Sequence, residues 1–299
     1  MKNNLKKLSE LSVRVLAISF ICIQCTSSSS SNKNEKDITQ VSDSESSHSI
    51  EIELDTTESD YAFIAPSPIQ IASIIQKAEM SYVDGITNEI ENVNNYTTLF
   101  HQSINFGVYA SDIAYCVTND KYDEAGNYMK VIKDLSKKIG LETVFQSSNL
   151  IDRFEENIGN QDSIMDLLIY IQTHTDDYIQ DNGLNDLNVI YFTGAWIEGM
   201  FLGTHAVVGD ADKKISILLS EQMTIANSLI RGLEHIKDKN DDITDLTEHI
   251  KNVVSEYNNL WSNKQAGENI EYLDTELKHE EVVKISSMIT ELRNEITLK

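Results

Sequence analysis

The sequence has few of the residues that interrupt or cross-link a fold. It contains two prolines and three cysteines in 299 residues, and both prolines, Pro66 and Pro68, lie in the first quarter of the chain. The stretch of about 230 residues without proline that follows favours long helices over strands joined by tight turns. Three cysteines are too few for a disulfide framework, so a disulfide-stapled fold is excluded.

Positive charge is also scarce, because 24 basic residues stand against 48 acidic ones. Without the first 24 residues, 20 basic and 47 acidic residues remain, a net charge of −27. A field of this sign repels nucleic acids and anionic membrane surfaces. We therefore expect no nucleic-acid partner, and we expect cations to be attracted only non-specifically.

The sequence lacks the motifs of the common catalytic and cofactor sites. It has no Gly-x-Ser-x-Gly, no phosphate-binding glycine loop and no His-Glu-x-x-His. It also lacks a pair of Cys-x-x-Cys motifs, which could bind a metal together. The Glu-x-x-His at Glu276 and His279 lies among polar residues, where a solvated helix face is the simpler interpretation. We expect no cofactor and no metal, and this lowers the expectation of an enzyme without excluding one.

The first 24 residues have the features of an export signal. Four basic residues and one acid precede the apolar run VLAISFICI, from Val15 to Ile23. A basic start followed by a short apolar run is typical of a secretory signal peptide. The run of nine residues is too short for a membrane-spanning helix, which needs about 20.

Cys25 directly follows this signal and precedes a serine run, Ser27 to Ser31. This arrangement resembles a lipoprotein signal peptide, in which such a cysteine becomes the lipid-modified first residue of the mature protein. Cys22 and Gln24 depart from the usual residues at their positions. Ordinary cleavage near Ser27, which would release a soluble protein, is the alternative. Acyl chains would anchor the protein, since each buried methylene contributes about 0.8 kcal/mol.

Residues 25–66 are rich in Ser, Asp and Glu and poor in large apolar side chains. Such a segment cannot bury enough surface to offset the entropy of ordering. We expect a disordered tether that holds a folded domain, residues 67–299, away from the membrane. The expected location is the cell envelope, with the domain facing the periplasm or the cell surface.

From Ser67 onward, apolar residues recur in steps of three and four, the period of a helix. Ser67 and Pro68 are typical of a helix start, Asn240 of an N-cap, and Gly140 and Gly183 of helix ends. We expect an all-α array of antiparallel helical hairpins. The expected helices are roughly 68–81, 97–118, 121–139, 147–158, 161–182, 186–208, 211–239, 241–262 and 277–297.

The most apolar part of the domain is Val189 to Val208, in which Glu198 and His205 are the only residues that can carry a charge near neutral pH. Its length would suffice for a membrane span, but Glu198 at its middle is costly in hydrocarbon. A central helix buried by its neighbours is the favoured interpretation. Gly194, Gly199 and Gly203 would then let neighbouring backbones come close, at a cost of roughly 1 kcal/mol each in helix propensity.

Asp112 lies in a similarly apolar segment and is, with Glu198, the sharpest functional candidate. A buried carboxylate must be paired, hydrogen-bonded or protonated. If the two helices face each other, Asp112, Glu198 and His205 could bind a cation or the amine of a ligand, with or without catalysis. The simpler alternative is that groups inside the bundle satisfy each carboxylate. Cys116, in the same segment as Asp112, fits a small buried hydrophobe.

Two segments, FGVYASDIAY from Phe106 to Tyr115 and TGAWIEGMFLGTH from Thr193 to His205, resemble those of uncharacterised helical lipoproteins of Bacteroidota. The resemblance implies an all-helical exported domain, and it assigns no reaction and no functional residue. The favoured function is a non-enzymatic binding or scaffolding module that contacts another envelope protein. A ligand or cation site on the buried carboxylates is the alternative.

Overall fold

The computed structural model describes residues 81–146, 149–205, 211–266 and 276–298, which all belong to one compact unit, Ser59–Lys299. The described residues form helices and no strand, so the predicted all-α fold is confirmed. The elements are η1, a 3₁₀ helix (Ile90–Asn94), and the α-helices α2 (Leu99–Thr118), α3 (Tyr122–Lys138), α4 (Glu142–Gln146), α5 (Leu150–Glu156), α6 (Gln161–Asp181), α7 (Asn185–His205), α8 (Ala211–His235), α9 (Asp241–Asn259), α10 (Trp261–Ala266) and α11 (His279–Thr297). Cys25, the tether and the helix predicted at 68–81 lie outside the described residues.

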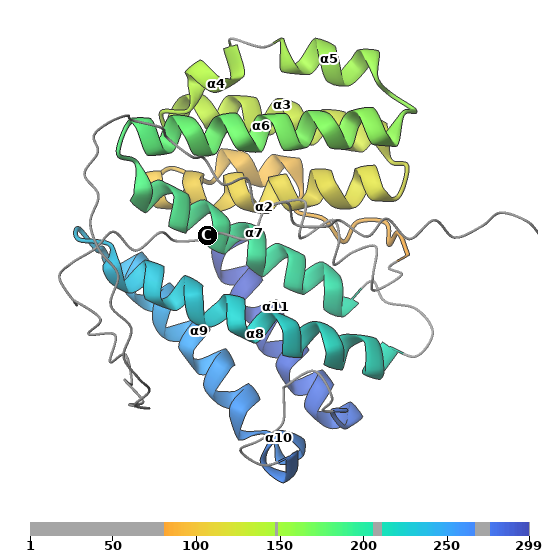
Figure 1. The fold of residues 1–299 in the computed structure, drawn as a ribbon, viewed down its shortest axis with the longest axis vertical. Coiled ribbons are helices and arrows are strands. Elements are labelled where there is room, and N and C mark those ends of the chain that lie inside the picture. The colour runs from red at the N-terminus through yellow and green to blue at the C-terminus, as the bar shows by residue number, and fades with distance from the viewer. Residues whose placement is uncertain (1–80, 147–148, 206–210, 267–275, 299) are drawn as a thin grey trace, which may run out of the picture. The chain divides into compact units, whose positions relative to one another are not determined.

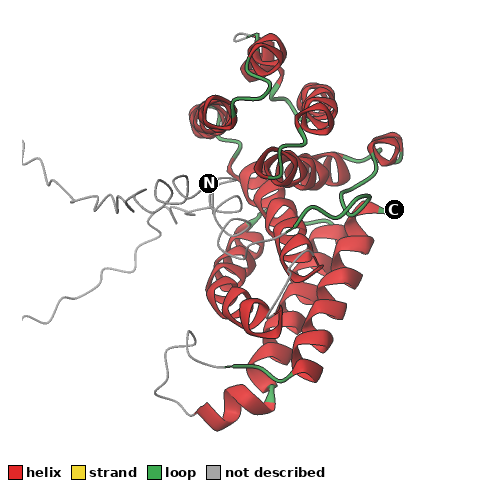
Figure 2. Ribbon diagram, turned by 90° about the vertical axis from the view of Figure 1, so that its right-hand side faces the viewer, coloured by secondary structure: helices red, strands yellow, loops and turns green. Residues whose placement is uncertain are grey.

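The helices form two groups on either side of a central pair, α2 and α7 (Figure 1). In the first group α3, α4, α5 and α6 pack on one another and on the pair. In the second group, α8, α9 and α11 complete a ring with α7, in which each helix contacts the next. Figure 2 views the first group nearly end-on and the second group from the side. Helix α7 therefore belongs to both packing units.

Helix α7 is buried around its whole circumference over its middle turns, because every residue from 189 to 200 is buried. The prediction of a central buried helix is confirmed. None of the described helices is both long and apolar enough to cross a bilayer.

The backbones of α2 and α7 touch where each helix carries a glycine. A Cβ atom placed on Gly194 would lie 1.9 Å from the carbonyl oxygen of Ile104, and one on Gly107 would lie 1.8 Å from that of Tyr191. Both distances are far below van der Waals contact, so glycine is required at both positions. The expected close approach at Gly194 is confirmed, and Gly107 is its counterpart on α2.

The two central helices run in the same direction. Gly107 lies against Tyr191 and Ala195, and one turn later the Ser111 hydroxyl donates to the Ala195 carbonyl at 2.9 Å. The contacts thus move toward the C-terminal ends of both helices together. Residues one turn beyond the two glycines are consequently brought face to face.

Most helix ends agree with the sequence. The Asn240 side chain accepts a hydrogen bond from the N–H of Ile243 at 2.9 Å, as predicted for an N-cap. Gly140 and Gly183 follow their helices with φ of +84° and +66°, the left-handed conformation of a C-cap glycine.

Three predicted helices differ from the structure, and the one predicted at 211–239 already ends at His235. The helix predicted at 241–262 ends at Asn259, because Leu260 is extended, with ψ of 144°. The Glu281 carboxylate, 19 residues away, accepts from the N–H of Ser262 at 3.0 Å and so caps the start of α10. The helix predicted at 147–158 begins only at Leu150, and it is preceded by α4, a five-residue helix that the sequence pattern did not reveal.

We expect Gly194→Ala to destabilise the fold by at least about 2 kcal/mol, because the added methyl group meets a backbone carbonyl that cannot move aside. Chemical denaturation measures this change. Gly126→Ala in α3 is the matched control, since its Cβ would lie 3.5 Å from Phe154 Cε1, an ordinary contact. The control should gain up to about 1 kcal/mol from helix propensity. Equal effects of the two substitutions would show that the α2–α7 contact is not this close.

Candidate functional site

Asp112 and Glu198 meet inside the contact between α2 and α7. Asp112 lies about one turn beyond Gly107 on α2, and Glu198 lies one turn beyond Gly194 on α7. Both side chains are completely buried. The two acids lie close enough for each to act on the pKa of the other. The structure thus brings together two of the predicted site residues.

Arg293 of α11 pairs with this buried charge. Its Nε donates to Glu198 Oε2 at 3.0 Å, and its Nη2 donates to Oε1 at 3.3 Å. This is the two-pronged geometry with which arginine binds a carboxylate. The guanidinium also lies 4.7 Å from the ring centroid of Phe201. A side chain of the protein therefore supplies the positive charge that a bound cation or amine would otherwise have to supply.

The other contacts of Asp112 come from the segment before α2. The backbone N–H of Asn88 donates to Asp112 Oδ2 at 3.2 Å, whereas Oδ1 is buried and accepts no hydrogen bond from a described N–H group. The Asn88 side chain donates to the Tyr96 hydroxyl, which donates to the Thr297 carbonyl at 2.9 Å. This network joins the segment before α2 to the end of α11.

Three further tyrosines hold the segment 81–96 against the helices. The hydroxyls of Tyr109 and Tyr128 donate to it at 2.9 and 2.8 Å. The Tyr115 hydroxyl both donates to this segment and accepts from it. Burial raises the pKa of all three hydroxyls, so they remain hydrogen-bond donors at neutral pH.

Burial dominates the electrostatics of the pair. It raises the pKa of Asp112 well above its usual range, and the neighbouring Glu198 raises this pKa further. Burial also raises the pKa of Glu198, but the charge and hydrogen bonds of Arg293 oppose this rise. The two acids thus have different environments, and the arginine favours the ionised form of Glu198.

His205, the third predicted site residue, is not part of the cluster. It is exposed at the end of α7, where its Nδ1 lies 2.9 Å from the Phe201 carbonyl and its Nε2 lies 3.2 Å from Thr290 Oγ1. The predicted trio therefore divides into an enclosed pair and a surface histidine. The arrangement matches the simpler alternative, in which groups inside the bundle satisfy the two carboxylates.

Sequence reasoning missed Arg293 and Asn88. One signal for Arg293 was available, because it lies four residues after Ile289 and three before Ile296, on the buried stripe of α11. An arginine on an apolar stripe needs a buried partner. Asn88 binds through its backbone, so its side-chain identity gave no signal for this contact.

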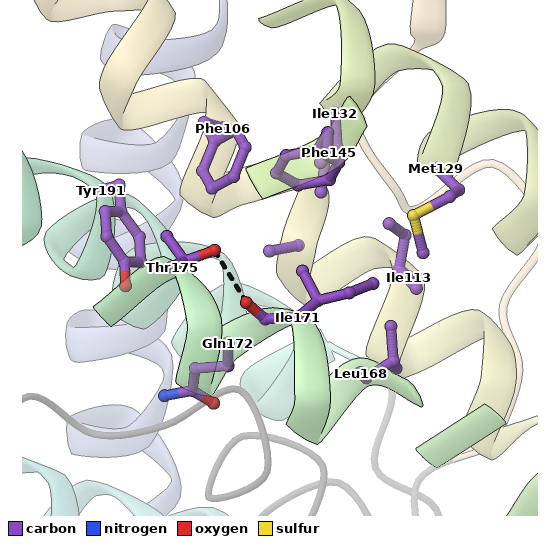
Figure 3. Close-up of a pocket in the computed structure, with 11 residues that line it drawn as sticks. Phe106, Ile113, Met129, Ile132, Phe145, Leu168, Ile171, Gln172, Thr175 and Tyr191 are labelled. Carbon is purple, nitrogen blue, oxygen red and sulfur yellow. Dashed lines mark hydrogen bonds between the residues drawn. The ribbon is translucent and has the colours of Figure 1, made fainter. Parts of the chain in front are cut away.

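A separate apolar cavity of about 50 Å³ lies between α2, α3, α4, α6 and α7 (Figure 3). Phe106, Ile113, Met129 and Phe145 contribute to its walls. On the α6 side, Leu168, Ile171 and Gln172 are partly exposed, and Figure 3 shows Gln172 pointing away from the apolar side chains. The cavity therefore lies next to the surface along α6, away from Asp112 and Glu198.

Other candidates from the sequence have ordinary surroundings. Cys116 is buried, as predicted, and burial raises the pKa of its thiol. His279 is exposed, with its Nδ1 3.0 Å from a carboxylate oxygen of Asp212. Within the described ranges, no three His, Cys, Asp or Glu side chains are placed to hold a metal ion.

No family model, curated protein or solved structure matches this chain.

We expect Arg293→Met to destabilise the fold by roughly 3–5 kcal/mol, because it leaves the Glu198 charge buried without its partner. Arg231→Met is the matched control, since Arg231 is exposed on α8 and should change stability by less than about 0.5 kcal/mol. Urea denaturation of both variants measures the difference. A loss at Arg293 no larger than that at Arg231 would contradict the buried pairing.

Proposed function

We propose that the protein is an exported envelope lipoprotein, anchored through a lipid on Cys25, whose helical domain is a non-enzymatic binding module for another envelope protein. The apolar cavity beside α6 is the observation that carries the binding role. The anchoring role rests on the sequence, whose signal, serine run and acidic tether precede the domain. The resemblance to helical lipoproteins of Bacteroidota supports the same location.

A lipid anchor suits the charge of this chain. The sequence after residue 24 carries a net charge of −27, which opposes attachment to an anionic membrane by surface charge. Acyl chains provide attachment that does not depend on charge, at about 0.8 kcal/mol for each buried methylene. The acidic tether then separates the domain from the anchor.

The cavity provides a place for an apolar group of a partner. An empty apolar cavity costs stability at about 24 cal/mol per Å³, roughly 1 kcal/mol for this one. Filling it from the α6 side recovers that energy without a change of fold. Its size suits the end of one aliphatic side chain, and a protein partner with such a side chain on its surface can supply it.

A ligand or cation site at Asp112 and Glu198 is the alternative function. The geometry favours it less, because both carboxyl groups are completely buried and Arg293 already balances the charge of Glu198. A cation at this position would have to displace the arginine or share the carboxylates with it. The cavity therefore remains the better binding site.

Cys25→Ala is expected to abolish incorporation of a clickable fatty-acid label in cells and to release the protein from the membrane fraction. Cys22→Ala is the control and should keep both the label and the membrane association. In-gel fluorescence of the immunoprecipitated protein measures the label. A Cys25→Ala protein that is still labelled would refute the anchor.

Ala110→Leu is expected to fill the cavity from α2 and to abolish partner binding, while it preserves or raises the melting temperature. Thr173→Leu on the exposed face of α6 is the control, which adds the same side chain outside the cavity. A photo-crosslinking residue at position 172 reports binding in intact membranes. Crosslinks that are unchanged in Ala110→Leu would show that no partner enters the cavity.

A further inference from the structure

One oxygen of Asp112 has no donor among the described residues, although the side chain is completely buried. Oδ2 accepts the Asn88 N–H, but Oδ1 accepts no hydrogen bond from a described N–H group. Glu198, the other completely buried acid between α2 and α7, lies close enough to act on the pKa of Asp112. Two ionised carboxylates cannot hydrogen-bond to each other, because both only accept. A proton between them allows a strong O–H···O⁻ hydrogen bond.

We propose that Asp112 is a neutral carboxylic acid at neutral pH and that its hydroxyl donates to the Glu198 carboxylate. Asp112, Glu198 and Arg293 then form one hydrogen-bonded chain across α2, α7 and α11 with no net charge. Loss of the proton places a second negative charge in the same enclosed space. The contact between the three helices therefore weakens as pH rises, which makes the docking of α11 sensitive to pH.

The proton resides on Asp112 because the two acids have unequal partners. Both prongs of Arg293 bind Glu198 and favour its ionised form, whereas Asp112 receives a single backbone N–H. The shift of the Asp112 pKa well above its usual range agrees with this assignment, and its causes are burial first and the Glu198 charge second.

The other titratable groups around Asp112 and Glu198 do not change which of the two acids holds the proton. Burial raises the pKa of the surrounding hydroxyls and of the thiol, so they are neutral at neutral pH. The exposed histidine acts on Glu198, whose pKa it lowers. Element by element, these groups are Tyr96 before α2, Tyr109, Tyr115 and Cys116 on α2, Tyr128 on α3, His205 on α7 and, as the charged partner, Arg293 on α11.

The direction of the pH effect follows from linkage. A group whose pKa is raised on folding stabilises the fold fully below its unfolded pKa, about 3.9 for aspartic acid. This contribution falls as pH rises and is lost once pH passes the folded pKa. Relative to Asp112→Asn, the unfolding equilibrium constant of the wild type should therefore rise about tenfold per pH unit within this window.

Infrared spectroscopy of the folded protein at neutral pH tests the proposal directly. The wild type should show the C=O stretching band of a protonated carboxylic acid, and Asp112→Asn should lack it. The asparagine amide can donate to Glu198 and accept from Asn88, so this variant should fold and have lost the additional pH dependence. Asp245→Asn on the exposed face of α9 is the matched control and should keep the band.

Three outcomes would overturn the proposal. The first is a wild type without the band at neutral pH, and the second is a band that persists in Asp112→Asn, which would place the proton elsewhere. The third is an Asp112→Asn protein that does not fold, because a neutral isostere should replace a neutral acid. Parallel pH dependence of unfolding in the wild type and Asp112→Asn would count equally against it.

Discussion

The close contact between α2 and α7 is the constraint on which the rest of the structure depends. At Gly107 and Gly194 the two backbones approach so closely that no side chain fits between them. Because the helices run in the same direction, the residues one turn further on face each other inside the contact. The burial of Asp112 and Glu198 is thus a consequence of two glycines.

Because the two acids are buried, the fold depends on partners for them that lie far away in the sequence. Arg293 is 95 residues from Glu198, and Asn88 is 24 residues from Asp112. Buried ion pairs often contribute little net stability, since desolvation offsets their attraction. Here the buried groups fix how the elements are arranged. Helix α11 must dock in one register to place the Arg293 guanidinium at Glu198. The segment 81–96 must lie across α2 to bring the Asn88 N–H to Asp112.

The sequence predicted what depends on local pattern. Helical period, the Asn240 cap and the terminating glycines follow from residues within a few positions of each other, and the apolar run around Glu198 indicated a central helix. Arg293, the break at Leu260 and the apolar cavity depend on residues brought together by the fold. Glu281 shows the reason well, since its capping of α10 joins positions 19 residues apart, and nothing in the pattern near Leu260 signals it.

The helices of the domain differ in how deeply they are buried. Helices α2, α7 and α11 share the enclosed charge cluster, whereas α6, beside the cavity, buries only Ile164, Leu167, Thr175 and Ile179 among its 21 residues. Native-state hydrogen exchange tests this division most directly. Amides of α2, α7 and α11 should exchange only through global unfolding, with one shared free energy, and those of α6 at a lower free energy. Exchange of α11 through a low-energy local opening, while α2 and α7 stay protected, would contradict the claim that the cluster unites the three helices.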